Sequence, residues 1–99
     1  MGKKALTGVK VLENSRMVAG PYCAKMLADF GAEVIKIEKP GVGDAARNRE
    51  PFLDDIPHPE RSGLFLYLNT NKLGVTLDMA SQAGRNIFLE LVKQTDILV

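Results

Sequence analysis

The chain has 99 residues, the size of one small domain, and its 45% hydrophobic and 25% charged residues are ordinary globular values that argue against disorder. Thirteen Lys and Arg against twelve Asp and Glu leave a formal net charge of +1, so no strong field favours nucleic acid or an anionic membrane. The single cysteine excludes an internal disulfide and a thiolate zinc site, and no apolar run approaches the roughly 18 residues of a membrane-spanning helix. No apolar stretch of the kind found in a secretion signal follows the first residues, so we expect a cytoplasmic protein without a metal site.

Two strands and a helix are predicted before residue 39. Residues 9–12 (Val-Lys-Val-Leu) form a short β-branched run between turn-forming residues, which is typical of a strand. Pro21 suits the first position of a helix, where a missing N–H costs no hydrogen bond. Apolar side chains then recur at the spacing of one helical face, which is expected to be buried: Cys23, Met26, Leu27 and Phe30. Gly31 is expected to end this helix in the left-handed conformation, and residues 34–37 (Val-Ile-Lys-Ile) predict a second strand.

A long connection separates these elements from the rest of the chain. Residues 39–73 contain every proline after Pro21, and within them only residues 64–68 have an ordered pattern, that of one or two helical turns. Such a connection is usually a binding loop or a disordered segment. Residues 75–78 alternate like a strand, Ser81 is a candidate helix N-cap, and residues 96–99 predict a fourth strand. A second helical face lies between them: Gly84, Ile87, Phe88, Leu91 and Val92.

The order of these elements predicts an α/β fold, a parallel sheet with helices packed on it and right-handed crossovers. The last strand ends in bare apolar residues, whereas a buried parallel strand normally leads into another element. We therefore expect residues 1–99 to be a fragment of a larger domain. The alternative is a genuine carboxy-terminal edge strand, although proteins avoid exposed apolar edges.

The turn at residues 17–21 is a first candidate site. In open α/β sheets, ligands bind outside the carboxyl ends of the strands and near helix N-termini. Exposed N–H groups in this turn suit a phosphate or a carbonyl oxygen, and simple entry into the helix is the alternative. The long connection adds cations that could hold a phosphorylated nucleotide, or else face solvent: Lys39, Arg47, Arg49, Arg61 and Lys72.

Other polar residues favour simpler interpretations. Glu38 ends the second strand, where dinucleotide-binding proteins place an acid on the ribose, but the first turn lacks the three spaced glycines of that fingerprint. Cys23 is expected to be buried and inert, and His58, between two prolines, to lie on a surface loop. The adjacent carboxylates at residues 54–55 favour a solvated turn. No combination of nucleophile, base and orienting group is recognisable.

Several segments resemble, in order, the N-terminal region of the family III CoA-transferases, which include formyl-CoA transferase, crotonobetainyl/carnitine CoA-transferase and α-methylacyl-CoA racemase. The run at residues 31–38 (Gly-Ala-Glu-Val-Ile-Lys-Ile-Glu), with Ala-Gly-Pro at 19–21 upstream, is the most specific part. The resemblance covers nearly the whole chain. Its other pieces are residues 6–12, 27–30, 41–44 with Arg47, 69–72, 77–78, 84–85 and 95–99.

This resemblance implies a Rossmann-like sheet and an interlocked homodimer for the full-length protein. It implies the transfer of CoA between carboxylic acids through an aspartyl-CoA thioester, a form of covalent catalysis. In the family the reactive aspartate lies beyond the length of this chain, so no catalytic residue is expected here. The expected ligands are an acyl-CoA and a carboxylic acid, with no nucleic acid and no membrane partner.

The resemblance also assigns binding positions. Val18 and Ala19 match residues that touch CoA at the first turn, and Lys39 matches a basic residue near the adenosine and its phosphates. A run of four matches the adenine end: Leu77, Asp78, Met79 and Ala80. Arg47 and Lys72 match basic positions whose roles are less defined.

Two departures from the family pattern leave the acyl substrate open. Ala80 stands where relatives often carry Lys or Arg, and Val18 replaces a polar residue of some transferases. The first interpretation of the whole resemblance is the CoA-binding N-terminal portion of a CoA-transferase. The alternatives are the corresponding part of an α-methylacyl-CoA racemase, and a non-enzymatic Rossmann-like binding module.

Overall fold

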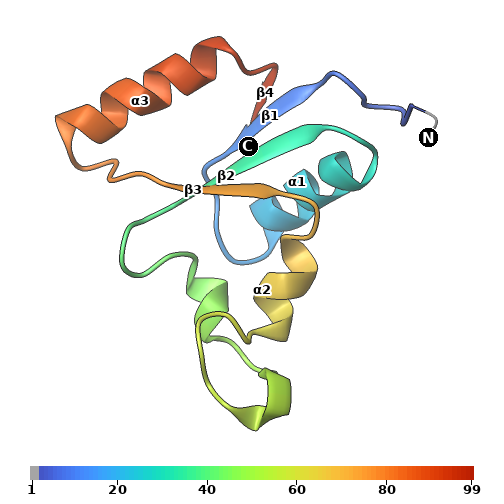
Figure 1. Cartoon of the computed structure of the whole chain (residues 1–99), viewed down its shortest axis with the longest axis vertical. Coiled ribbons are helices and arrows are strands. Elements are labelled where there is room, and N and C mark those ends of the chain that lie inside the picture. The colour runs from blue at the N-terminus through green and yellow to red at the C-terminus, as the bar shows by residue number, and fades with distance from the viewer. Residues whose placement is uncertain (1–2) are drawn as a thin grey trace.

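The computed structural model describes residues 3–99, which contain one four-stranded sheet (Figure 1). Its strands are β1 (Lys10–Glu13), β2 (Glu33–Glu38), β3 (Leu73–Thr76) and β4 (Ile97–Leu98), in the order β3-β2-β1-β4. Every neighbouring pair is parallel. The predicted α/β fold with a parallel sheet is confirmed.

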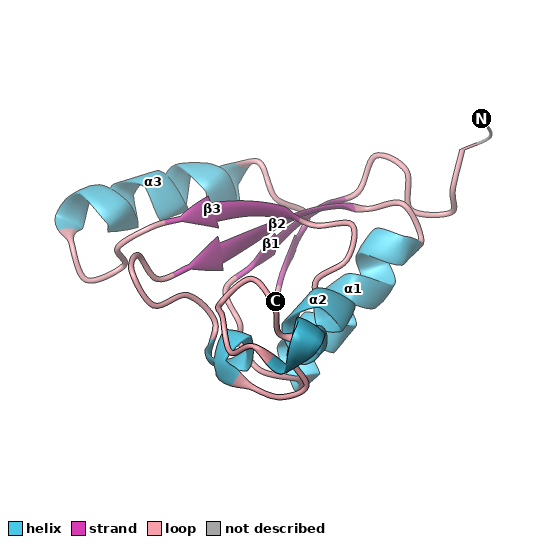
Figure 2. Cartoon of the chain, turned by 60° about the horizontal axis from the view of Figure 1, so that its bottom comes forward, coloured by secondary structure: helices cyan, strands magenta, loops and turns pink. Residues whose placement is uncertain are grey.

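Three α-helices accompany the sheet: α1 (Ala19–Asp29), α2 (Gly63–Leu68) and α3 (Gln82–Lys93). Figure 2 shows α1 and α2 together on one side of the sheet and α3 on the other. Parallel neighbours need such crossover connections, because a strand must return to its starting edge before it can pair again. None of the helices in residues 3–99 is long and apolar enough to cross a membrane.

The core lies between α1 and the two central strands. Val11 of β1 and Val34 of β2 pack against Ala24 and Ala28 of α1, together with Ala32. The small alanine side chains let the helix backbone approach the sheet closely, while the β-branched residues fill the strand surface. This packing fixes where α1 begins, and therefore where the turn between β1 and α1 lies.

The predicted buried face of the first helix was wrong. Cys23 is exposed, Met26 is exposed and Phe30 is 53% exposed, and only Leu27 is partly buried against the core. The helix instead turns Ala24 and Ala28 to the sheet, where their small side chains allow the helix backbone to approach Val11 and Val34 closely. Spacing alone identified an apolar stripe but not which stripe meets the sheet.

Strands β1, β2 and β4 begin and end within one residue of the predicted bounds, whereas the first helix and β3 differ by two residues. The first helix begins at Ala19, so Pro21 occupies its third position, which is tolerated because first-turn N–H groups have no partner within the helix. Strand β3 lies two residues earlier than predicted, because Leu73 to Thr76 pair with Ile35 to Glu38 of β2. The positive φ of Gly31 (107°) and the N-cap at Ser81 are confirmed.

The long connection is folded. After β2 the chain forms two short 3-10 turns, Ala45–Asn48 and Leu53–Asp55, and then α2, which together extend below the sheet in Figure 1. The buried hydroxyl of Ser62 donates to the backbone oxygens of Ala46 and Arg49, both at 2.8 Å, and accepts from the N–H of Phe65. One side chain thus ties the start of α2 to the first 3-10 turn.

Candidate functional site

A cavity of about 420 Å³ opens at one edge of the sheet, where β1, β2 and β3 end. Its walls are the segments that follow these three strands. Ligands of open parallel sheets bind at this edge, because the loops there diverge and leave a crevice. The lining residues are Asn14, Ser15, Arg16, Ile37, Glu38, Lys39, Gly43, Asp44, Leu77, Asp78, Met79 and Ala80.

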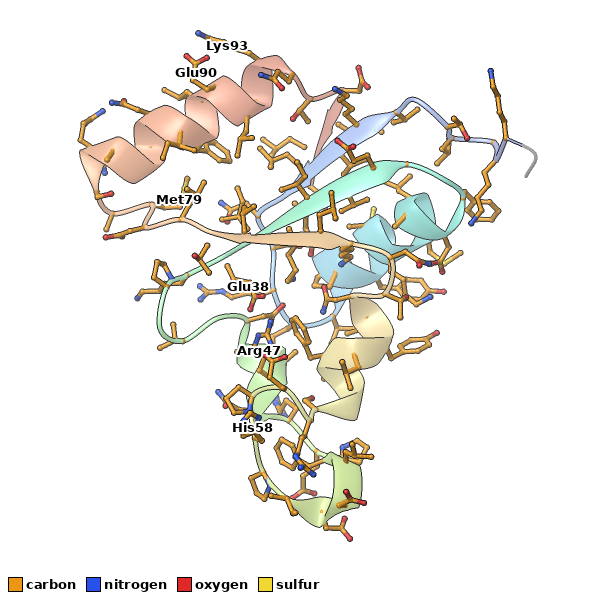
Figure 3. The ribbon with its side chains drawn as sticks, in the orientation of Figure 1. Glu38, Arg47, His58, Met79, Glu90 and Lys93 are labelled. Carbon is orange, nitrogen blue, oxygen red and sulfur yellow. The ribbon has the colours of Figure 1, made fainter. Side chains whose placement is uncertain are left out.

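Five of the nine predicted binding residues line this cavity: Lys39, Leu77, Asp78, Met79 and Ala80. Figure 3 shows Met79 beyond β3 at the same end of the sheet as Glu38. Val18 and Ala19 lie outside the lining, at the exposed start of α1. The turn at Asp78 is braced by its own carboxylate, which accepts from the N–H of Ala80 at 3.0 Å.

Sequence reasoning missed one wall of the cavity. Residues 14–16 follow β1 directly, and Arg16 is an exposed cation among them. The sequence did offer a signal for Arg16, because this residue follows the first predicted strand at the same edge of the sheet as Lys39. Neither Arg16 nor Lys39 has an ion pair with another residue of the range 3–99, so both cations are available to an anionic ligand.

Arg47 is committed to Glu38. Its Nε lies 2.8 Å from Oε2 of Glu38 and its Nη2 lies 2.7 Å from Oε1, and the guanidinium carbon stands 3.7 Å from the ring centroid of Phe65 (Figure 3). The hydrogen bond from Arg47 is the main reason that the pKa of the Glu38 carboxyl lies below its ordinary value, and the same bond raises the pKa of Arg47. Such a two-point pair holds the loop after β2 in place.

This pairing also removes Glu38 as a ribose acceptor. Besides Arg47, Oε2 of Glu38 accepts from the backbone N–H of Asp44 at 2.7 Å. Both carboxylate oxygens are therefore occupied within the protein. The geometry agrees with the missing glycine fingerprint, since the acid at the end of the second strand has a structural task.

Lys72 is buried in an ionic cluster behind the cavity. Its Nζ lies 2.7 Å from Oε1 of Glu13 and donates to the backbone oxygen of Pro21 at 3.0 Å. Lys36 lies 3.1 Å from Oε2 of Glu13 and 2.8 Å from Oδ2 of Asp44. We call these four side chains (Glu13, Lys36, Asp44 and Lys72) the ionic cluster. Their side chains are at most 2% exposed, and two cations balance two carboxylates.

The cluster perturbs the ionisation of its members. Burial lowers the pKa of Lys72, and the hydrogen bond and charge of Glu13 offset only part of this effect. Burial raises the pKa of Asp44, but the hydrogen bonds from Lys36, Ala46 and Met17 together lower it by more. The pKa of Asp44 therefore lies below its ordinary value. Neutralised in this way, the cluster is a framework for the cavity walls rather than a set of charges for a ligand.

The remaining polar candidates lie on the connection surface. Arg61 donates to the backbone oxygen of Leu53 and lies 3.4 Å from Asp54, and Arg49 is exposed. His58 is exposed as expected, and its Nδ1 accepts from the N–H of Glu60. Within residues 3–99, no group of three or more His, Cys, Asp or Glu side chains is placed to hold a metal ion.

The chain matches the family model of CoA-transferase family III over residues 6–99. It is 47% identical over 96 residues to the formyl-CoA:oxalate CoA-transferase of Bradyrhizobium diazoefficiens, covering 97% of this chain and 22% of that protein. It is 40% identical over 95 residues to the succinyl-CoA:mesaconate CoA-transferase of Haloarcula hispanica, covering 96% of this chain and 24% of that protein.

The fold has solved counterparts as well. The crystal structure of a CaiB/BaiF family protein from Brucella suis superposes with a TM-score of 0.85 at 32% identity, over 98% of this chain and 25% of that one. The chain thus spans about a quarter of the length of the proteins it matches. Because the family model covers residues 6–99, nearly the entire sequence, the chain belongs to CoA-transferase family III.

Proposed function

We propose that this chain forms the CoA-binding portion of an enzyme that transfers CoA between carboxylic acids. The observation that carries the proposal is the cavity at the carboxyl edge of the sheet, which Lys39 and the segment 77–80 line together. A nucleotide with a pyrophosphate needs an apolar surface for its base and cations for its phosphates. Leu77 and Met79 supply the first, and Lys39 supplies the second.

The roles of the site residues follow from these positions. Leu77, Asp78, Met79 and Ala80 contact the adenine end, and Lys39 binds a phosphate. Val18 and Ala19, at the start of α1, face the pantetheine and thioester portion. Arg47 and Lys72 support the cavity without contacting CoA, because their charged groups are paired with Glu38 and Glu13.

The chemistry of the proposed reaction needs a further group. An aspartate outside residues 1–99 attacks the acyl-CoA carbonyl, and CoA leaves as the thiolate. The thiolate then attacks the aspartyl carbonyl of the resulting anhydride, which releases the donor acid as its carboxylate and leaves an aspartyl-CoA thioester. The acceptor carboxylate attacks this thioester and expels the thiolate, which opens the second anhydride at the acceptor's acyl carbon to give the new acyl-CoA and the free aspartate. The partners are an acyl-CoA and a carboxylic acid in the cytoplasm, and the full-length enzyme is an interlocked homodimer. The transferase names of the relatives at 47% and 40% identity support this reading over the racemase.

Titration of the chain with CoA, followed by backbone amide shifts, tests the proposal. We expect shifts at Lys39 and residues 77–80, and Lys39→Ala should weaken binding about tenfold, the usual loss for one charge-assisted contact. Lys93→Ala is the matched control, because Lys93 pairs with Glu90 on the far end of α3 (Figure 3). Pantetheine, which lacks the nucleotide, should bind wild type and Lys39→Ala alike. Equal CoA affinity of the two lysine variants would contradict the assignment.

A further inference from the structure

Asp44 connects three segments around the cavity through one buried carboxylate. The residue is 3% exposed. Its Oδ1 accepts from the N–H groups of Met17 and Ala46, both at 2.9 Å, and its Oδ2 lies 2.8 Å from Nζ of Lys36. Its own N–H donates to Glu38. The turn after β1, the loop after β2 and the strand β2 itself therefore meet at this side chain.

The turn after β1 carries a strained residue. Met17 has a φ of 69°, in the left-handed region that L side chains rarely adopt. Such conformations persist only where the surroundings hold them, and they concentrate at functional sites. The hydrogen bond from Met17 N–H to Asp44 is the contact that holds this one.

The position of Met17 gives the strain a consequence. Arg16, directly before it, lines the cavity, and Val18, directly after it, is the N-cap of α1. A change of the Met17 backbone would re-aim both neighbours at once. Lys36 fixes the other end of the turn, because its Nζ also donates to the backbone oxygen of Ser15 at 3.2 Å.

We propose that Asp44 is a positioning residue for CoA binding: it locks Met17 in the left-handed conformation and so pre-forms the Arg16 wall of the cavity. This inference rests on the proposed function. Asp44 acts through the turn, since its carboxylate is used up by Met17, Ala46 and Lys36. A cavity wall that is ordered before CoA binds loses less conformational entropy on binding, which raises the affinity.

The test uses two substitutions in the chain. Asp44→Ala should weaken CoA binding about tenfold, as expected for loss of the buried acceptor of the Met17 N–H. Met17→Gly added to Asp44→Ala should recover much of that loss, because glycine adopts a positive φ without strain. Asp55→Ala is the control, since Asp55 is an exposed carboxylate with a similar φ of 58° on the connection. It should leave affinity unchanged.

Amide hydrogen exchange gives a second readout that needs no ligand. In Asp44→Ala the Met17 amide loses its acceptor and should exchange at least about tenfold faster, while the Leu12 amide in β1 keeps its protection. Unchanged protection of the Met17 amide in this variant would contradict the proposal that Asp44 holds Met17 in the left-handed conformation. Faster exchange in β1 as well, without rescue by Met17→Gly, also overturns it and assigns Asp44 to general stability. Failure of the wild-type chain to bind CoA refutes the proposed function, and exchange at Met17 still decides whether the lock exists.

Discussion

Ala80 is an uncharged residue of the cavity. It is exposed and lines the cavity together with Lys39 and Arg16, which we propose bind the phosphates of CoA. We predict that Ala80→Lys tightens CoA binding up to about tenfold, by adding an ammonium group near the phosphates. The gain should shrink as salt is raised, because exposed charges are screened.

A neighbouring position serves as the control for this prediction. Ala83→Lys places the same charge near the start of α3 but outside the cavity lining. It should leave CoA affinity within about twofold of wild type, since distant exposed charges contribute little. Calorimetric titrations of both variants with CoA and with pantetheine decide the matter. An equal gain for the two variants, or a gain with pantetheine, would show that the added lysine does not meet the nucleotide.

Cys23 tests the orientation of α1. The sequence predicted a buried thiol, whereas the structure exposes it on the side of the helix away from Ala24 and Ala28. We therefore predict complete reaction with a chromogenic disulfide reagent under native conditions, at a rate close to that of the urea-unfolded chain. Protection of the thiol by more than about a hundredfold would indicate that the predicted face, and not the alanine face, meets the sheet.

The pairing of charges was the part of the site that sequence could not supply. Lys39, Arg47 and Lys72 look alike as basic residues of one connection, yet only Lys39 lines the cavity without an ion pair among residues 3–99. Lys72 meets Glu13 across 59 positions of the chain, and nothing local marks either residue as buried. Composition and spacing report which charges exist, whereas their neutralisation depends on tertiary contacts.

At the scale of elements, local signals predicted order and type but not every boundary. The end of α1 and the start of α3 were readable because the signals at Gly31 and Ser81 are local, whereas α1, which has no side-chain N-cap, begins two residues before Pro21. Strand β3 was displaced because its extent depends on pairing with β2 rather than on its own side chains. The folding of the 39–73 connection was also beyond local pattern, because it depends on contacts within the connection between distant residues. The hydroxyl of Ser62, for example, bonds to the backbone oxygen of Ala46, sixteen residues earlier.

Gly84 couples α3 to the segment that lines the cavity. A Cβ at this position would lie 1.9 Å from the backbone oxygen of Asp78. We predict that Gly84→Ala lowers the free energy of unfolding by about 1–3 kcal/mol, the usual cost of forcing atoms into filled space. Urea unfolding followed by circular dichroism measures it. Gly74→Ala is the control, because a Cβ there has no atom within 4 Å. A comparable loss in both variants would mean that helix and strand propensities, rather than the clash, set the cost.

For the whole molecule, the ionic cluster and the Glu38–Arg47 pair join elements that apolar packing leaves apart. The apolar cluster lies between α1 and the central strands, whereas the pairs Lys36–Asp44 and Glu38–Arg47 tie the 39–73 connection to β2. Asp44 links this connection to β2 and to the turn after β1. The shape of the cavity and the stability of the fold therefore depend on the same carboxylates.

This dependence predicts an acid-sensitive fold. The pKa values of Glu38 and Asp44 lie below the ordinary 4.5 and 3.8, so in the window beneath those values the unfolded chain binds more protons than the folded one. Their contribution to the free energy of unfolding is therefore complete above about pH 5 and is lost as pH falls through the lower, folded pKa values. Urea unfolding at a series of pH values should give a shallower acid decline in Asp44→Asn than in wild type or Asp55→Asn. The three proteins should decline in parallel only if the Asp44 carboxylate is not held ionised by Lys36 and the two backbone N–H groups.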